Sequence, residues 1–186
     1  MELEIVTKTA GSARPPLLFV HGSSHAAWCW EEHFLEFFAV RGFDAHAISL
    51  RGHGRSGGQD RLRWTTVSNY VDDVRSVAIA LPRPCVLIGH SLGGLVVQKY
   101  LEQYQAAGAV LLASSPAGGM LRSGLRLVLR HPVLFAKVHL AFNPGVLYAT
   151  PARARRFLFS TEASATNRFG DTPRASDGNR SGRCST

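Results

Sequence analysis

A serine between two glycines, Ser91, has the residue type and the surroundings for nucleophilic chemistry. It lies in Gly89-His90-Ser91-Leu92-Gly93, between an apolar run and a stretch with helical spacing. Small residues at 89 and 93 permit a sharp strand-to-helix turn, which would lift the serine hydroxyl clear of a sheet. The helix N-terminus that follows carries partial positive charge, and the Leu92 N–H would point to where an oxyanion forms. We therefore predict that Ser91 is a catalytic nucleophile, that Leu92 supplies one oxyanion donor and that His90 borders the substrate pocket. A glycine-rich turn without a chemical role is the alternative.

A second polar loop follows an earlier apolar run, at His21-Gly22-Ser23-Ser24-His25. Acyl transfer needs two hydrogen-bond donors on the oxyanion, and the second commonly comes from a backbone N–H in such a loop. The Ser23 N–H is the best candidate, followed by that of Ser24. The residues expected to line the substrate pocket are His21, Gly22, Ser24 and His25. For His21, a structural histidine that braces the loop by hydrogen bonds is favoured over a role in proton transfer.

The three cysteines offer neither a disulfide framework nor a metal site. Cys29, Cys85 and Cys184 lie far apart in the sequence and form no CxxC pair, although zinc sites and redox motifs use such spacings. We therefore expect the cysteines to stay reduced, and we expect no metal and no cofactor.

The positive charge is concentrated in the last third of the chain. The 186 residues carry a net charge of +8, but residues 1–119 hold 10 Lys/Arg and 10 Asp/Glu, whereas residues 120–186 hold 11 and 3. The first two thirds are therefore balanced like an ordinary enzyme core, and we expect no nucleic-acid partner. Attachment to a membrane surface or to nucleic acid through the basic segment 122–156 is an alternative. A cap with a solvated arginine face is sufficient to explain that segment and is favoured, so we expect no membrane-surface contact.

The apolar content of 45% is enough for a buried core, but no apolar run reaches the ~18 to 20 residues of a membrane-spanning helix. The N-terminus, Met1-Glu2-Leu3-Glu4, is acidic where a secretory leader would be basic. We therefore expect a cytoplasmic location.

The elements that hold these loops alternate between short β-rich runs and longer helical patterns. The expected strands are Glu2 to Thr9, as a weaker edge strand, and then Pro16 to His21, Asp44 to Leu50, Pro84 to Gly89 and Gly108 to Ser114. The expected helices are Trp28 to Arg41, Val67 to Leu81 with Thr66 as N-cap, and Leu92 to Gln105. Near-continuous apolar runs are typical of strands buried on both faces. The pattern predicts an α/β protein with a mostly parallel sheet flanked by helices.

The order of the strand-ending motifs resembles the α/β-hydrolase family over about residues 1–160. These motifs are His21-Gly22, then Arg51-Gly52-His53-Gly54-Arg55-Ser56, then Gly89-His90-Ser91-Leu92-Gly93-Gly94, and then Ser114-Ser115-Pro116. Residues 21–30, HGSSHAAWCW, are also similar to the methylesterase and hydroxynitrile-lyase branch, whereas RGHGRS is more like bacterial esterases, lipases and lysophospholipases. The resemblance implies the α/β-hydrolase fold with a helical cap. Serine at 91, where haloalkane dehalogenases and epoxide hydrolases of the family carry aspartate, argues against those two chemistries.

The resemblance also implies an acid and a histidine that follow Ser91 in the chain and complete a catalytic triad. The later histidines are His131 and His139, both inside the expected cap, and the later acidic residues are Glu102, Glu162, Asp171 and Asp177. We expect none of these to complete a triad. Asp72 and Asp73 precede the serine, and we expect both to lie on a solvated helix face or to form a local cap.

Three segments are expected along the chain. Residues 1–115 form the N-terminal part of the hydrolase core, and residues 116–160, where prolines interrupt short amphipathic helices, form a partial helical cap. Residues 161–186 contain no Leu, Ile, Val, Met, Trp or Tyr, so we expect a disordered tail, which a shifted reading frame would explain. The family's later strands and helices have no counterpart in this tail, and the expected fold is therefore incomplete and truncated at its C-terminal side.

The combined prediction is a serine hydrolase that acts on carboxylic esters or other acyl substrates, of the esterase, lipase or lysophospholipase type. The apolar cap implies a small lipophilic substrate. Because the triad acid and histidine are missing, we expect the 186-residue chain to be inactive. The alternative is a non-catalytic binding protein or pseudo-enzyme fragment that keeps the pocket. The sequence leaves open the identity of the substrate, the oligomeric state, and whether the early end reflects a real product, a frameshift or a premature stop.

Overall fold

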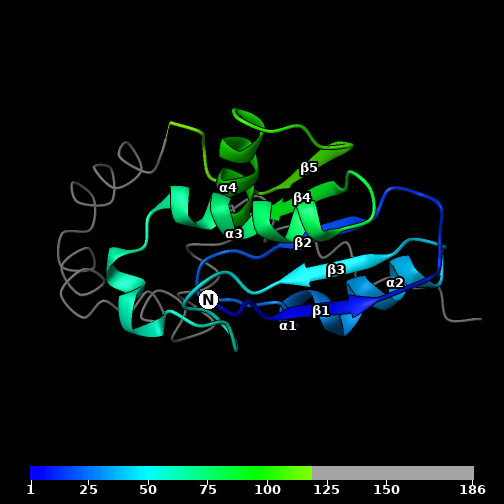
Figure 1. Ribbon diagram of the computed structural model, residues 1–186, viewed down its shortest axis with the longest axis horizontal. Coiled ribbons are helices and arrows are strands. Elements are labelled where there is room, and N and C mark those ends of the chain that lie inside the picture. The colour runs from blue at the N-terminus through cyan, green and yellow to red at the C-terminus, as the bar shows by residue number, and fades with distance from the viewer. Residues whose placement is uncertain (119–186) are drawn as a thin grey trace, which may run out of the picture. The chain divides into compact units, whose positions relative to one another are not determined.

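A five-stranded sheet forms the centre of residues 1–118, the part of the chain that the computed structural model describes (Figure 1). The strands are β1 (Ile5–Lys8), β2 (Leu17–Val20), β3 (Ala45–Ile48), β4 (Val86–His90) and β5 (Gly108–Leu112). They lie in the order β1-β3-β2-β4-β5. β1 pairs antiparallel with β3 at one edge, and all other pairs are parallel. The mostly parallel sheet predicted from the sequence is confirmed, and so is the edge strand within residues 2–9.

Helices cover both faces of this sheet (Figure 1). On one face lie α3 (Val67–Ala80) and α4 (Leu92–Leu101). On the other face a helical segment consists of α1 (Trp28–Trp30), the π-helical turn η1 (Glu31–Leu35) and α2 (Glu36–Ala39). The three predicted helices are therefore present, although the first contains a π-helical turn. A 3₁₀ helix, η2 (Gln59–Trp64), was not predicted.

The start of α3 follows from its N-terminal side chains. The backbone N–H of Asn69 donates to Thr66 Oγ1 at 3.3 Å, and the backbone N–H of Thr66 donates to Asn69 Oδ1 at 3.0 Å. This reciprocal pair is a capping box, which satisfies backbone donors that the first helical turn leaves free. The prediction of Thr66 as N-cap is confirmed.

Two apolar cores form because side chains along a strand alternate between the faces of the sheet. Val20 of β2 packs in the core under α3 and α4, together with Val74 and Val96. Phe19 faces the opposite core, where Trp30 packs against it with ring centroids 5.1 Å apart. Burial on both faces explains why the sequence of β2 is a continuous apolar run.

The expected cap and tail fall, from residue 119 onward, outside the described residues. Among residues 1–118, no helix combines the length and the apolar content needed to cross a membrane.

Candidate active site

Ser91 is the single residue between β4 and α4. Its φ of 51° and ψ of −113° lie in a region that residues with a side chain rarely adopt. Four backbone hydrogen bonds hold it there. Its N–H donates to the carbonyl oxygen of Leu112 at 3.0 Å, and its own carbonyl oxygen accepts from the N–H groups of Gly94 (3.1 Å), Leu95 (3.2 Å) and Ser115 (3.0 Å). The first turn of α4 and the chain around the end of β5 therefore fix the strained peptide.

The chain is packed so closely around this turn that only glycine fits at two positions. A Cβ atom on Gly93 would clash with the carbonyl oxygen of Val20 and would lie 2.5 Å from that of His21. A Cβ atom on Gly89 would lie 2.5 Å from the carbonyl oxygen of Gly93. Gly89 thus allows the first turn of α4 to lie against the end of β4, and Gly93 allows α4 to contact the end of β2. Because the loop of residues 21–25 follows β2 directly, this contact brings that loop to the turn between β4 and α4.

The loop lies directly against Ser91. A Cβ atom on Gly22 would stand 3.1 Å from the Cβ of Ser91 and 3.0 Å from Nδ1 of His90. The loop is closed by a turn in which the His25 N–H donates to the carbonyl oxygen of Gly22 at 3.3 Å, and Ser24 adopts a φ of 62°. The fold therefore places the two segments predicted to carry the oxyanion donors side by side.

The backbone N–H groups of Ser23 and Leu92 are the two predicted oxyanion donors. Within residues 1–118, neither N–H donates to a protein acceptor. Ser23 is exposed and Leu92 is half-buried. Both donors are thus available to a ligand oxygen, and no acceptor within residues 1–118 has to be displaced.

His21 is fully buried under the same loop. The Leu50 N–H donates to Nε2 of His21 at 3.0 Å, so this nitrogen carries no proton, and Nδ1–H donates to the carbonyl oxygen of Gly22 at 2.7 Å. Burial lowers the pKa of His21 to about 4, so the ring is neutral at pH 7. With both nitrogens engaged, His21 connects the loop to the chain after β3 and presents no free polar atom to a ligand.

His25 and His90 form an aromatic wall beside Ser91. Their ring centroids are 6.4 Å apart and nearly perpendicular, and His25 also stacks on Trp28 at 5.6 Å. Nδ1 of His25 lies 2.9 Å from the carbonyl oxygen of Ser23 and is fixed by it. Burial lowers the pKa of His90, and the neighbouring His25 lowers it further. Two histidine rings therefore border the serine on this side.

Asp73 does not lie on a solvated helix face as predicted. It is only 2% exposed and forms an ion pair with Arg51, whose side chain is 25% exposed. Arg51 Nε donates to both carboxylate oxygens at 3.0 Å, its Nη2 donates to Oδ1 at 2.6 Å, and its backbone N–H donates to Oδ2 at 2.9 Å. The pair ties the loop after β3 to α3. The sequence contained the signal, since Asp73 shares the buried helix face of Tyr70 and Val77. Asp72, by contrast, is exposed as predicted.

Glu4 links the loops after β2 and β3, a role that the sequence analysis missed. Its Oε2 accepts from Ser49 Oγ at 2.7 Å and from the Arg55 N–H at 2.9 Å, and its Oε1 accepts from Arg55 Nε at 2.7 Å. Ser49 Oγ in turn accepts from the Ala27 N–H at 2.9 Å. The backbone hydrogen bond from Arg55 is the largest cause that lowers the pKa of Glu4. No local sequence pattern marks Glu4, because all its partners come from distant segments.

The other candidate residues do not join the site in the described part of the chain. Glu102 pairs with Lys99 at 2.8 Å on the surface of α4. His131, His139, Glu162, Asp171, Asp177 and Cys184 lie outside the described residues. Cys29 and Cys85 are free thiols whose pKa is raised by burial, to about 11 for Cys29. Among residues 1–118, no group of three His, Cys, Asp or Glu side chains is placed to hold a metal ion.

The sequence of this chain is similar to those of known hydrolases. A monoacylglycerol lipase of Mycolicibacterium smegmatis is 34% identical over 140 residues, which is 72% of this chain and 47% of the lipase. Methylesterase 10 of Arabidopsis thaliana is 34% identical over 91 residues, 47% of this chain and 32% of the esterase. This chain thus spans less than half the length of these relatives.

Solved structures share the fold. The monoacylglycerol lipase of Paleococcus ferrophilus superposes with a TM-score of 0.53 at 25% identity, over 71% of this chain and 53% of the lipase. Est816, an enzyme that degrades N-acyl homoserine lactones, superposes with a TM-score of 0.57 at 22% identity, over 83% of this chain and 57% of Est816. The sequence pattern of the Alpha/beta hydrolase family matches residues 17–182. The chain therefore belongs to the Alpha/beta hydrolase family.

Proposed function

We propose that this protein is a serine hydrolase that acts on carboxylic esters or other acyl substrates, with Ser91 as its nucleophile. The observation that carries the proposal is the strained backbone of Ser91 beside two N–H groups that have no protein acceptor within residues 1–118. Strain that costs on the order of 1 to 3 kcal/mol persists where the surrounding structure holds it for a function. An ordinary turn would not need it.

The geometry supports acyl transfer in the following way. Ser91 Oγ attacks the carbonyl carbon of the substrate, its proton passes to a base, and the carbonyl oxygen becomes an oxyanion. The N–H groups of Ser23 and Leu92 donate to this oxyanion, which develops charge only during the reaction. The N-terminus of α4, immediately after Ser91, adds its positive potential. The rings of His25 and His90 border one side of the serine.

The relatives favour an ester as substrate. Two of the matched proteins are named as a lipase for monoacylglycerols and as a methylesterase. Both names describe hydrolysis of a carboxylic ester. We infer that this protein takes a small lipophilic ester or acyl compound.

Residues 1–118 do not place a general base next to Ser91 that could take the proton of its hydroxyl. In this part of the chain, no side chain is hydrogen-bonded to Ser91 Oγ. A serine without an adjacent base is a weak nucleophile at neutral pH. This observation favours a second candidate function, a binding protein that keeps the ligand pocket without turnover.

A fluorophosphonate probe tests the role of Ser91, because serine attack on phosphorus expels fluoride and leaves a stable adduct. We expect the 186-residue chain to label at Ser91, but about 10⁴-fold more slowly than a serine hydrolase with a complete triad. Intact mass and peptide mapping would locate the adduct. The Ser91→Ala variant should lose it, whereas Ser12→Ala, at a half-buried serine before β2, should label like the parent chain.

Two outcomes would contradict the proposal. Labelling that persists in Ser91→Ala, or that spreads equally over several serines, would remove Ser91 as the nucleophile. Rapid labelling confined to Ser91 would support the nucleophile but refute the expected lack of a base. In that case His25→Ala and His131→Ala variants would identify the base.

A further inference from the structure

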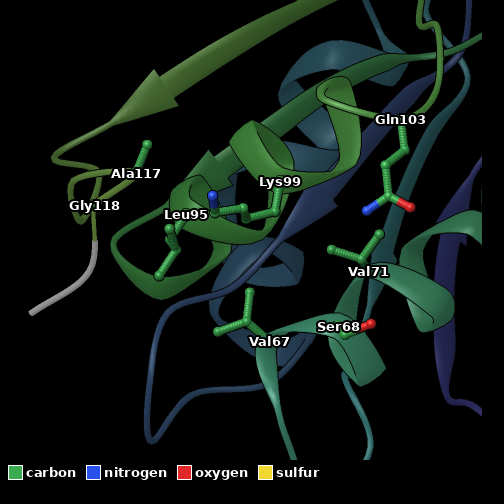
Figure 2. A pocket seen from close by; sticks show the side chains of 8 residues that line it. All are labelled: Val67, Ser68, Val71, Leu95, Lys99, Gln103, Ala117 and Gly118. Atoms are coloured by element: carbon green, nitrogen blue, oxygen red, sulfur yellow. The ribbon is translucent and has the colours of Figure 1, made fainter.

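A groove between α3 and α4 is lined by none of the residues proposed for catalysis. Figure 2 shows side chains of the two helices facing one another across it, with the loop after β5 at one end. The lining consists of Val67, Ser68 and Val71 from α3, Leu95, Lys99 and Gln103 from α4 and the turn after it, and Ala117 and Gly118. Its volume is about 300 Å³, at the lower end of the range for small-molecule sites. The volume therefore fits a small ligand.

The groove combines apolar walls with one charged side chain, a lining that suits an amphiphilic ligand. Val67, Val71, Leu95 and Ala117 supply apolar walls, and Lys99 supplies a cation. The Lys99 ammonium is paired with Glu102 at 2.8 Å, and both side chains are partly exposed, at 36% and 54%. An exposed pair of this kind contributes little to stability, so a ligand carboxylate can replace Glu102 at small cost. Apolar walls with one cation favour an anion that carries an apolar chain.

We propose that this groove binds a carboxylate with an apolar chain of about eight carbons. The chain lies between the valines of α3 and Leu95, and the carboxylate accepts hydrogen bonds from the Lys99 ammonium. Each methylene buried from water strengthens binding by up to about fourfold, and ligands of this size reach dissociation constants of about 1 mM. Binding does not depend on the proposed function, because none of the lining residues takes part in the proposed reaction.

Titration of the full 186-residue chain with octanoate, followed by ¹H–¹⁵N chemical shifts, tests the proposal. We expect shifts at the amides of Val71, Leu95 and Lys99, and weaker binding of octan-1-ol and of butanoate than of octanoate. Lys99→Met should weaken octanoate binding about fivefold and leave octan-1-ol unchanged. Gln103→Glu, which adds a negative charge at the rim, should also weaken octanoate binding.

Lys8→Met is the matched control, because Lys8 forms a comparable exposed pair with Glu36 at 3.7 Å away from the groove. Neither it nor Ser91→Ala should alter octanoate binding, and circular dichroism should show that all variants stay folded. Three results would overturn the proposal: equal affinity for octanoate and octan-1-ol, full octanoate binding in Lys99→Met, or shifts centred on Phe34, Phe37 and Phe38, which line a second cavity.

Discussion

The buried ring of His21 makes the stability of the fold depend on pH. Its folded pKa is about 4, below the value of roughly 6.5 expected in the unfolded chain. Between these values the unfolded state binds more protons, so stability from this residue is fully present above about pH 6.5 and is lost as the pH falls toward about 4. The complete loss is on the order of 3 kcal/mol.

Urea unfolding between about pH 8 and pH 4 would measure this effect. The slope of the free energy of unfolding in that window should flatten in His21→Asn. His33→Asn, at an exposed histidine, should keep the slope of the parent chain. If His21→Asn kept it as well, another group would have to account for the acid sensitivity.

The ion pair between Asp73 and Arg51 gives a second prediction at this scale. Asp73→Asn leaves the Arg51 guanidinium without its partner charge. Removing one partner lowers the free energy of unfolding by more than the intact pair contributes, because the remaining charge stays partly buried and uncompensated. We expect the free energy of unfolding to fall by about 2 to 3 kcal/mol. Asp72→Asn changes the same residue type at an exposed neighbouring position and should stay within about 0.5 kcal/mol of the parent. Equal effects of the two variants would mean that the pair contributes nothing specific.

At the scale of the elements, the packing of α4 against the end of β2 depends on Gly93. In Gly93→Ala, the added Cβ would meet the backbone oxygens of Val20 and His21, which cannot rotate away. We expect a loss of about 3 kcal/mol in the free energy of unfolding and a displaced loop at residues 21–25. Gly108→Ala is the matched control, since its nearest neighbour would be 3.8 Å away. Thermal unfolding of both variants would decide, and equal melting temperatures would be inconsistent with this packing.

Most elements could be predicted from the sequence because their causes are local. Apolar runs marked the buried strands, and Thr66 marked the start of α3 through its own side chain. The π-helical turn within residues 28–39 and the 3₁₀ helix before α3 left no comparable pattern. The motif around Ser91 predicted a strand-to-helix turn because Gly89 is required by a contact with Gly93, four residues later, although Gly93 itself is required by contacts with the distant Val20 and His21. The burial of Asp73 was predicted wrongly and the role of Glu4 was missed, because the partners of both residues lie 22 or more residues away in the sequence.

At the scale of the whole molecule, β5 presents an apolar edge. Within residues 1–118 it pairs only with β4, and Val110 and Leu111 are each 45% exposed. An open strand edge with apolar side chains is a template for pairing with another chain. We therefore expect the 186-residue chain to associate in solution and to unfold without a sharp transition.

Light scattering after size exclusion would measure this association. Val110→Lys should increase the monomer fraction, because a charge at an edge strand opposes pairing. Val40→Lys adds the same charge at a valine that is 69% exposed outside the sheet, and it should leave association unchanged. A monomeric parent chain with a cooperative thermal transition would count against this prediction.

Within residues 1–118, the hydrogen bonds that hold the strained turn at Ser91 do not involve the serine side chain. All four hydrogen bonds use its backbone N–H and carbonyl oxygen, so another amino acid at this position would be held in the same posture. Its side chain would project from the same point, beside the N–H groups of Ser23 and Leu92. The surrounding backbone determines the conformation at position 91, whereas the amino acid at that position determines the reactive atom. Exchange of this one side chain would therefore change which atom lies next to the oxyanion donors and leave the backbone of the turn in place.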